Sequence, residues 1–183
     1  MASRDEEFAR FFDEFYPSLC RFLECLLGGG RGGGAQATTA QDIAQDAFLQ
    51  LHRAGFDSFP AGEARFWLFR VARNMALNEL SKRQTRLRLF DKVVDTFRGH
   101  VPRPDEEFEL AETKERVAEM LKLLPEHQRA ALLLREQEEM SYREIAQVLE
   151  VSEAKVKVDI FRARTTLRER WGKQQRAAAQ GAN

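Results

Sequence analysis

Cysteine and histidine, which often bind metals or act in catalysis, are scarce in this sequence. Its 183 residues include only two cysteines, Cys20 and Cys25, and three histidines that stand alone. On a helix the two cysteines would point to different faces, and no Cys/His cluster surrounds them. We therefore expect no metal site, no structural disulfide, no cofactor and no enzymatic activity.

Long apolar runs and a net charge are also missing. No run of 18 apolar residues is present, and the acidic start does not resemble a signal peptide. We therefore expect a soluble, cytoplasmic protein with no membrane insertion. The 29 lysines and arginines equal the 29 aspartates and glutamates, so no overall positive field attracts nucleic acid.

The glycine-rich segment 28–34 lacks the lysine of a phosphate-binding loop, and a flexible connection explains it better than a nucleotide site.

Sequence patterns typical of β-strands are absent too. Apolar residues recur at helical spacing and predict an all-α fold. The first helix begins at a Ser3–Glu6 capping box and is interrupted or kinked at Pro17. Further helices are expected at 39–53, from 64 to 83 or beyond, from 110 to 124 and from 125 to 138.

These helices group into two small domains joined by a linker. We expect an N-terminal domain at residues 1–90, a C-terminal domain at residues 111–175 and a disordered tail at residues 176–183. The linker, residues 91–110, contains two prolines and an acidic cluster with little apolar periodicity.

Charge is distributed unevenly along the chain. Residues 62–90 contain seven Lys/Arg against two Glu, and residues 153–176 contain eight against three acids. Residues 91–119 contain nine acids against five bases. Two basic regions separated by an acidic one favour two nucleic-acid surfaces, although ordinary solvated helix faces are the alternative.

Residues 141–164 have the pattern of a helix-turn-helix. Ser141 and Glu144 form a capping box for a short helix, and Ser152 is a good N-cap for a second, basic helix. The inward positions of the second helix are Val156, Ile160, Ala163 and Leu167. Such a unit fits the major groove of DNA, and a plain helical hairpin is the alternative.

Three groups of residues, in this order, resemble bacterial sigma factors of the extracytoplasmic-function (ECF) group. They are Asp42-Ile-Ala-Gln-Asp-Ala-Phe-Leu49, then Phe66-Trp-Leu-Phe-Arg-Val-Ala-Arg-Asn-Met-Ala-Leu77, then Leu124-Pro-Glu126 with Ser141-Tyr-Arg-Glu-Ile-Ala146. The resemblance covers about residues 5–172. It implies a transcription initiation factor that binds core RNA polymerase and promoter DNA, controlled by an anti-sigma factor or another regulator.

The resemblance implies that the N-terminal domain binds the polymerase clamp and melts the promoter -10 element. The polymerase contact would be Asp42, Gln45, Asp46 and Leu49. Asn74 matches the family position that lines a pocket for an extruded -10 base, and Trp67 is either a stacking platform or a core residue. The implied -10 residues are Trp67, Arg70, Arg73, Asn74, Asn78, Lys82 and Arg83.

The C-terminal domain would read the -35 element. The expected contacts are Ser152, Lys155, Lys157, Val158, Asp159, Phe161, Arg162 and Arg164. Val158 and Asp159 depart from the small polar residue and the arginine usual in the family, and Glu150 takes a turn position often held by glycine. Asp159 could pair with Lys155 and Arg162 on the same helix, but we favour contact with a cytosine amine, with Val158 against a thymine methyl group.

The competing interpretation is a polymerase-independent regulator with a C-terminal helix-turn-helix and a helical N-terminal sensor or dimerisation domain. The basic face at residues 70–83 favours the sigma-factor interpretation, because a sensor domain has no need for such a face.

Overall fold

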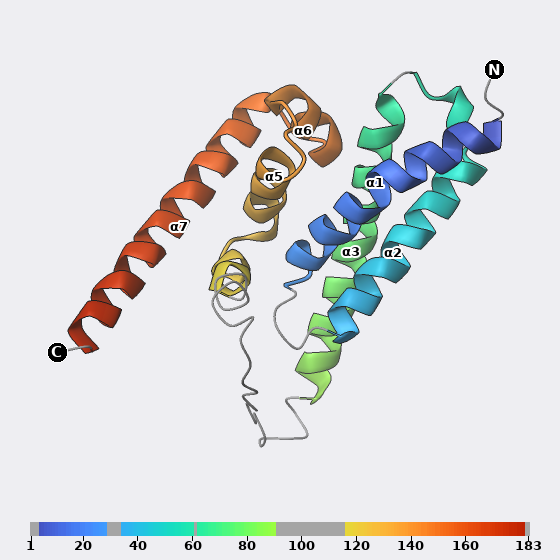
Figure 1. Cartoon of the computed structure of the whole chain (residues 1–183). Coiled ribbons are helices and arrows are strands. Elements are labelled where there is room, and N and C mark those ends of the chain that lie inside the picture. Colours follow the sequence, from blue (N-terminus) through green and yellow to red (C-terminus); the bar gives the residue numbers. More distant parts are fainter. Residues whose placement is uncertain (1–3, 29–33, 61, 91–115, 182–183) are drawn as a thin grey trace.

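The computed structural model describes residues 4–28, 34–60, 62–90 and 116–181, and the fold is all-α within these ranges. The N-terminal half contains α1 (Arg4–Leu26), α2 (Gly34–Arg53), the 3-10 turn η1 (Phe56–Ser58) and α3 (Glu63–Phe90). Residues 116–122 are helical, and α5 (Glu126–Glu136), α6 (Tyr142–Leu149) and α7 (Glu153–Gly181) follow. Figure 1 shows this arrangement, which confirms the predicted fold class.

The N-terminal half is a bundle of α1, α2 and α3 whose apolar faces meet in a core. Phe22 and Phe69 are fully buried there, with ring centroids 5.4 Å apart. A second group of aromatic rings joins the start of α1 to α2, where the centroids of Phe11 and Phe48 lie 6.1 Å apart. Aromatic pairs at such distances add to the free energy of burial. α1 continues through Pro17 instead of ending there.

The helix-turn-helix is built as its sequence predicts. The Ser141 hydroxyl accepts a hydrogen bond from the Glu144 main-chain N–H, and the Glu144 carboxylate accepts one from the Ser141 N–H at 2.6 Å. Glu150 ends α6 in the left-handed conformation, with φ 55° and ψ 44°. A non-glycine residue in this conformation stores roughly 1 kcal/mol or more of strain. The Ser152 hydroxyl then accepts from the Lys155 N–H at 3.3 Å and caps α7.

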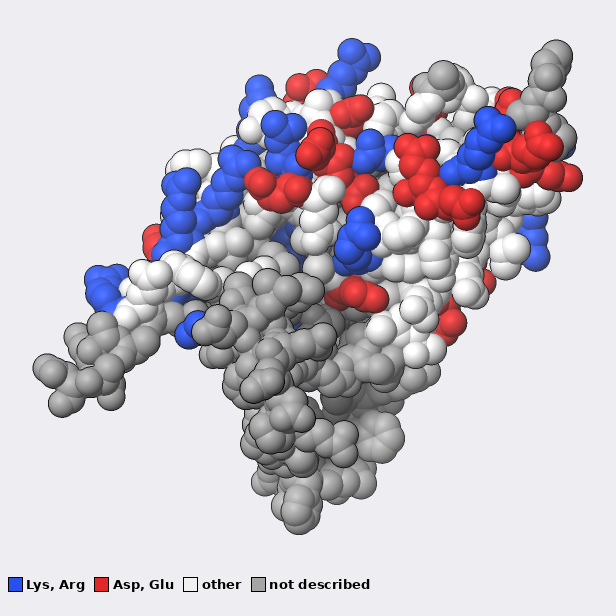
Figure 2. Space-filling view, viewed as in Figure 1, with Lys and Arg blue, Asp and Glu red and all other residues white. Residues whose placement is uncertain are grey.

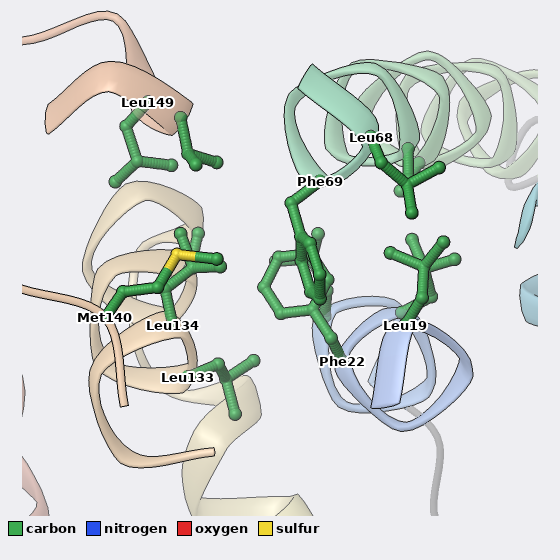
Figure 3. Packing of buried hydrophobic residues seen from close by; sticks show 14 of the residues in the cluster. Leu19, Phe22, Leu68, Phe69, Leu133, Leu134, Met140 and Leu149 are labelled. Carbon is green, nitrogen blue, oxygen red and sulfur yellow. The ribbon is translucent and has the colours of Figure 1, made fainter. Parts of the chain in front are cut away.

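The two halves share one apolar cluster. α5 lies against α1, and α6 lies against α3 (Figure 1). Figure 3 shows Phe22 and Phe69 of the N-terminal half turned toward Leu134 and Met140 of the C-terminal half, and all four belong to a single buried cluster. The sequence predicts two units joined by a linker, and the structure adds this apolar interface between them.

Two boundaries differ from the sequence-based expectation. α2 begins at Gly34 instead of near residue 39, and α7 continues to Gly181, where a disordered tail is predicted. Alanine and glutamine are abundant at residues 174–180, and both favour helix. The predicted linker at residues 91–110 and the Ser3 cap lie outside the described residues. None of the helices in the described ranges is both long and apolar enough to cross a membrane.

Candidate nucleic-acid interface

The first candidate DNA surface lies on α3. Asn74, Asn78 and Lys82 are exposed and form a row, because residues four positions apart project from the same side of a helix. We name these three residues the α3 row. Amide and ammonium groups at this spacing can hydrogen-bond to base edges and to phosphate oxygens.

Two arginines of α3, Arg70 and Arg73, contact carboxylates of the C-terminal half. Arg73 donates two hydrogen bonds to the Glu126 carboxylate, at 2.9 Å from Nε and 2.8 Å from Nη2. The two side chains are only 14% and 22% exposed. A second arginine, Arg70, lies 3.5 Å from the carboxylate of Glu150. Two of the predicted -10 residues are therefore paired with glutamates, and the Arg73 pair has the strong two-pronged geometry.

Two further arginines, which the sequence analysis missed, hold the same interface. Arg65 donates to the main-chain oxygen of Glu138 at 2.7 Å and lies 3.2 Å from its carboxylate. Arg129 donates to the main-chain oxygen of Leu26 at 2.9 Å, and burial lowers the pKa of its guanidinium. The position of Arg129 in the sequence could have revealed its role. It directly precedes the buried run 130–134, so its side chain must extend across apolar surface to place its guanidinium.

Trp67 and Arg83 are held within the N-terminal half. The Trp67 ring is half-buried, with its centroid 5.6 Å from that of Phe59, which favours the core role over the stacking role. Arg83 donates to the Thr39 hydroxyl at 2.9 Å and lies 3.4 Å from Glu79. Of the seven predicted -10 residues, the α3 row is therefore the part that is open to solvent.

The predicted polymerase contact is a continuous exposed strip on α2. Asp42, Gln45, Asp46 and Leu49 all reach solvent, and Leu49 is 52% exposed although it is apolar. The opposite side of α2 is buried in the core, so the strip is the free face of an amphipathic helix. An exposed leucine among carboxylates is suited to binding another protein.

On α7, the prediction that Asp159 projects toward DNA is wrong. Its side chain is 2% exposed and accepts a hydrogen bond from Lys155 Nζ at 2.8 Å, while His127 Nε2 lies 3.6 Å from its other oxygen. Helical geometry explains the error. Asp159 lies three residues after Val156 and four before Ala163, both fully buried, so it shares their side. The competing interpretation, an ion pair within the helix, is confirmed for Lys155.

The exposed face of the N-terminal part of α7 has two apolar side chains at its centre. Val158 and Phe161 are 45% and 70% exposed and are neighbours on the helix surface, since they are three positions apart. Exposed Lys157 and Arg162 lie beside them. We name Val158 and Phe161 the apolar pair.

A groove of about 310 Å³ borders the apolar pair on the side of α6. Its lining is mostly aromatic and basic and consists of Tyr142, Lys157, Ile160, Phe161, Arg164, Thr165 and Arg168. Lys157 Nζ lies 5.7 Å from the centre of the Tyr142 ring, and a hydrogen bond to Glu136 raises the pKa of Arg164. Figure 2 shows Lys and Arg gathered over α7, whereas acidic side chains are more frequent over α1.

Comparison with known families gives two matches along the chain. The description "Sigma-70 region 2" matches residues 11–86, and "Sigma-70, region 4" matches residues 114–167. The RNA polymerase sigma-H factor of Pseudomonas aeruginosa is 35% identical over 140 residues, which cover 72% of each chain. The ECF RNA polymerase sigma-E factor of Haemophilus influenzae is 33% identical over 133 residues, covering 67% of this chain and 69% of its own.

Two solved structures have a similar fold. One is the sigma factor RpoE in complex with the anti-sigma factor NepR from Bartonella quintana, with a TM-score of 0.66, 24% identity, and coverage of 89% of this chain and 95% of that one. The other is CnrH in complex with the cytosolic domain of CnrY, with a TM-score of 0.63, 24% identity, and coverage of 93% and 91%. The likeness extends over both halves of the chain.

Proposed function

This chain belongs to the sigma-70 family, in its ECF group of promoter-recognising transcription initiation factors, and we propose how its helices divide that work. The observation that carries the proposal is the presence of both matched regions on one chain, each with an exposed polar or basic helix face. We propose that α2 binds core RNA polymerase, α3 binds the -10 element and α7 binds the -35 element, with no catalysis by the chain itself.

The α2 strip supports the polymerase contact. Its carboxylates can pair with basic residues of a partner, and Leu49 offers an apolar anchor at one end of the strip. Because the buried side of α2 is fixed in the core, the strip is presented on a rigid element, as a specific docking surface requires.

The α3 row supports the -10 contact. The Asn74 amide can hydrogen-bond to the edge of an extruded base, while Asn78 and Lys82 can hold the neighbouring backbone. Arg73 can join them only after it exchanges Glu126 for phosphate, since the carboxylate occupies its guanidinium in the described arrangement. We therefore propose that this arrangement is a closed state and that promoter binding separates the two halves.

The face of α7 supports the -35 contact. The N-terminal part of α7 is the second helix of the helix-turn-helix, the element that enters the major groove in such motifs. Lys157 and Arg162 can reach phosphates on either side of the groove, and Arg164 can do so once it exchanges Glu136 for phosphate, whereas Asp159 supports the helix from within. Such phosphate contacts give affinity that falls with salt.

We also propose that a regulator of the anti-sigma class controls this protein. The support is that RpoE and CnrH, which share its fold, were each captured with a second protein, and RpoE's partner is an anti-sigma factor. A regulator that stabilises the closed state would keep Arg73 on Glu126 and away from promoter DNA. The proposed compartment is the cytoplasm, where the polymerase acts.

Binding experiments with purified core RNA polymerase test the proposal. We expect the chain to co-elute with core polymerase, and to bind promoter DNA tightly only in its presence, because the chain has no net charge. Asp46→Arg should weaken co-elution, and the same change at Asp13, exposed on α1, is the control. Specific duplex binding by the chain alone, without co-elution, would instead support a polymerase-independent regulator.

A further inference from the structure

Burial of Asp159 changes what α7 can read in DNA. The exposed side chains in residues 153–162 are Glu153, Ala154, Lys155, Lys157, Val158, Phe161 and Arg162. Lys155 is hydrogen-bonded to Asp159, and Lys157 and Arg162 flank the apolar pair. The centre of the outward face therefore has no hydrogen-bonding side chain.

Valine and phenylalanine can recognise only apolar features of a base pair. In the major groove the one apolar group that an unmodified base pair displays is the C5 methyl of thymine; guanine, adenine and cytosine present acceptors and donors instead. We infer that the apolar pair reads C5-methyl groups on neighbouring pyrimidines of the -35 element, which are thymines in unmodified DNA. This inference rests on the proposed contact between α7 and the -35 element.

The charges around the apolar pair fit duplex DNA as the occupant. Lys157 and Arg162 lie on its two sides, and the adjoining groove adds Arg164 and Arg168. A helix with its side chains is about 10–12 Å across, and the major groove is about 12 Å wide, so cations at the edges of the helix meet the two phosphate walls. An apolar centre between two basic margins matches the methyl-lined floor and anionic walls of a thymine-containing groove.

The same geometry separates specificity from affinity. Val158 and Phe161 cannot contribute hydrogen bonds, so removing either should act at one base position and leave the salt dependence of binding unchanged. Lys157 and Arg162 approach phosphates, so removing either should weaken binding to all sequences alike and reduce the salt dependence.

Deoxyuridine substitution tests the inference, because it removes the C5 methyl and nothing else. The holoenzyme, made from the full chain and core RNA polymerase, first selects -35 sequences from a randomised duplex pool. Each thymine of the selected element is then replaced singly by deoxyuridine. At one position or at two neighbouring positions we expect binding to weaken about fourfold, as for the loss of one buried methyl group. At the same positions, 5-methylcytosine should bind better than cytosine by a similar factor.

Variants of the chain test whether Val158 and Phe161 cause the effect of the methyl group on binding. Val158→Ala and Phe161→Ala, tested separately, should each abolish the difference between thymine and deoxyuridine at one position. Both side chains are exposed, so the variants should fold, which circular dichroism checks. Lys157→Ala is the control: it should weaken binding but keep the thymine preference.

The outcomes separate this inference from the proposed function. Equal binding of thymine and deoxyuridine at every -35 position, or a difference that survives both alanine variants, overturns the inference and leaves the initiation function intact. A selected element without thymine overturns it as well. If the alanine variants lose affinity for core polymerase instead, the apolar pair is a protein-docking surface. A holoenzyme that enriches no -35 sequence overturns both proposals.

Discussion

Arg73 of α3 and Glu126 of α5 form a two-pronged ion pair that joins the two halves of this sigma factor. The pair is largely shielded from water, with side chains 14% and 22% exposed. It engages the same guanidinium that the α3 face would turn toward promoter DNA. If α3 binds the -10 element as proposed, closure of the two halves and that binding compete for one side chain.

Glu126→Gln should favour the open state. The amide has one acceptor atom instead of two, so the two-pronged geometry is lost, and it carries no charge. Hydrogen bonds to charged groups contribute about 1.5–3 kcal/mol each. We expect a longer distance between fluorophores on α2 and α7, and tighter binding of a single-stranded -10 oligonucleotide. Glu119→Gln is the matched control, because Glu119 pairs with Lys122 on the surface, where ion pairs contribute about 0–1 kcal/mol. Equal effects of the two changes would show that the Arg73 pair does not hold the closed state.

Asn74→Ala should reduce promoter opening without loss of folding or of polymerase binding. Asn74 is exposed, so its removal leaves no cavity, and one base contact contributes about 1–3 kcal/mol. The measurement is permanganate reactivity of thymines at the -10 element, with thermal unfolding as the folding control. Unchanged reactivity would remove Asn74 from the -10 contact.

Asp159→Ala should lower stability instead of changing the -35 sequence. The change leaves Lys155 without its buried partner and removes a part-buried charged hydrogen bond, at a cost of about 1–3 kcal/mol. Urea unfolding measures this loss, and Glu169→Ala, exposed further along α7, should cost much less. A new -35 preference in the Asp159 variant, with stability unchanged, would restore the role in base reading that its burial contradicts.

The free energy of unfolding should depend on pH through Glu144. The Ser141 main-chain N–H donates to this carboxylate and lowers its pKa below the ordinary value of 4.5. The resulting stabilisation is fully present above that value and is lost as pH falls through the lower pKa of the folded state. Glu144→Gln should make unfolding less dependent on pH in that acidic range. The same slope in both proteins would show that other carboxylates dominate.

The helices could largely be predicted from the sequence, because the patterns that define them are local in the chain. Capping residues such as Ser141 and Ser152 act within a few positions, and the apolar period fixes the inner face of each helix. The interface between the halves was not accessible in this way. This interface depends on residue pairs that are distant along the chain, such as Arg73 with Glu126. The hydrogen-bonding groups of such side chains could be satisfied by water as well as by another helix.

Exposure of the candidate site residues was predictable where they lie opposite the buried stripe of a helix. It was less predictable for residues at the edge of that stripe. The exposed α2 strip and the α3 row lie opposite buried stripes, so their position follows from helical spacing. Asp159 lies at the edge of the buried stripe of α7. A carboxylate there normally remains in water, but a lysine four positions earlier allowed it to be buried as a pair.

The central claim, that this chain directs core RNA polymerase to promoters, is tested most directly by in vitro transcription from a DNA pool with randomised -35 and -10 elements. The 5′ ends of the transcripts are sequenced with and without the chain. We expect starts that depend on both the chain and core polymerase and that share a -35 and a -10 sequence at fixed spacing. Starts that are the same without the chain, or that share no upstream sequence, would contradict the claim.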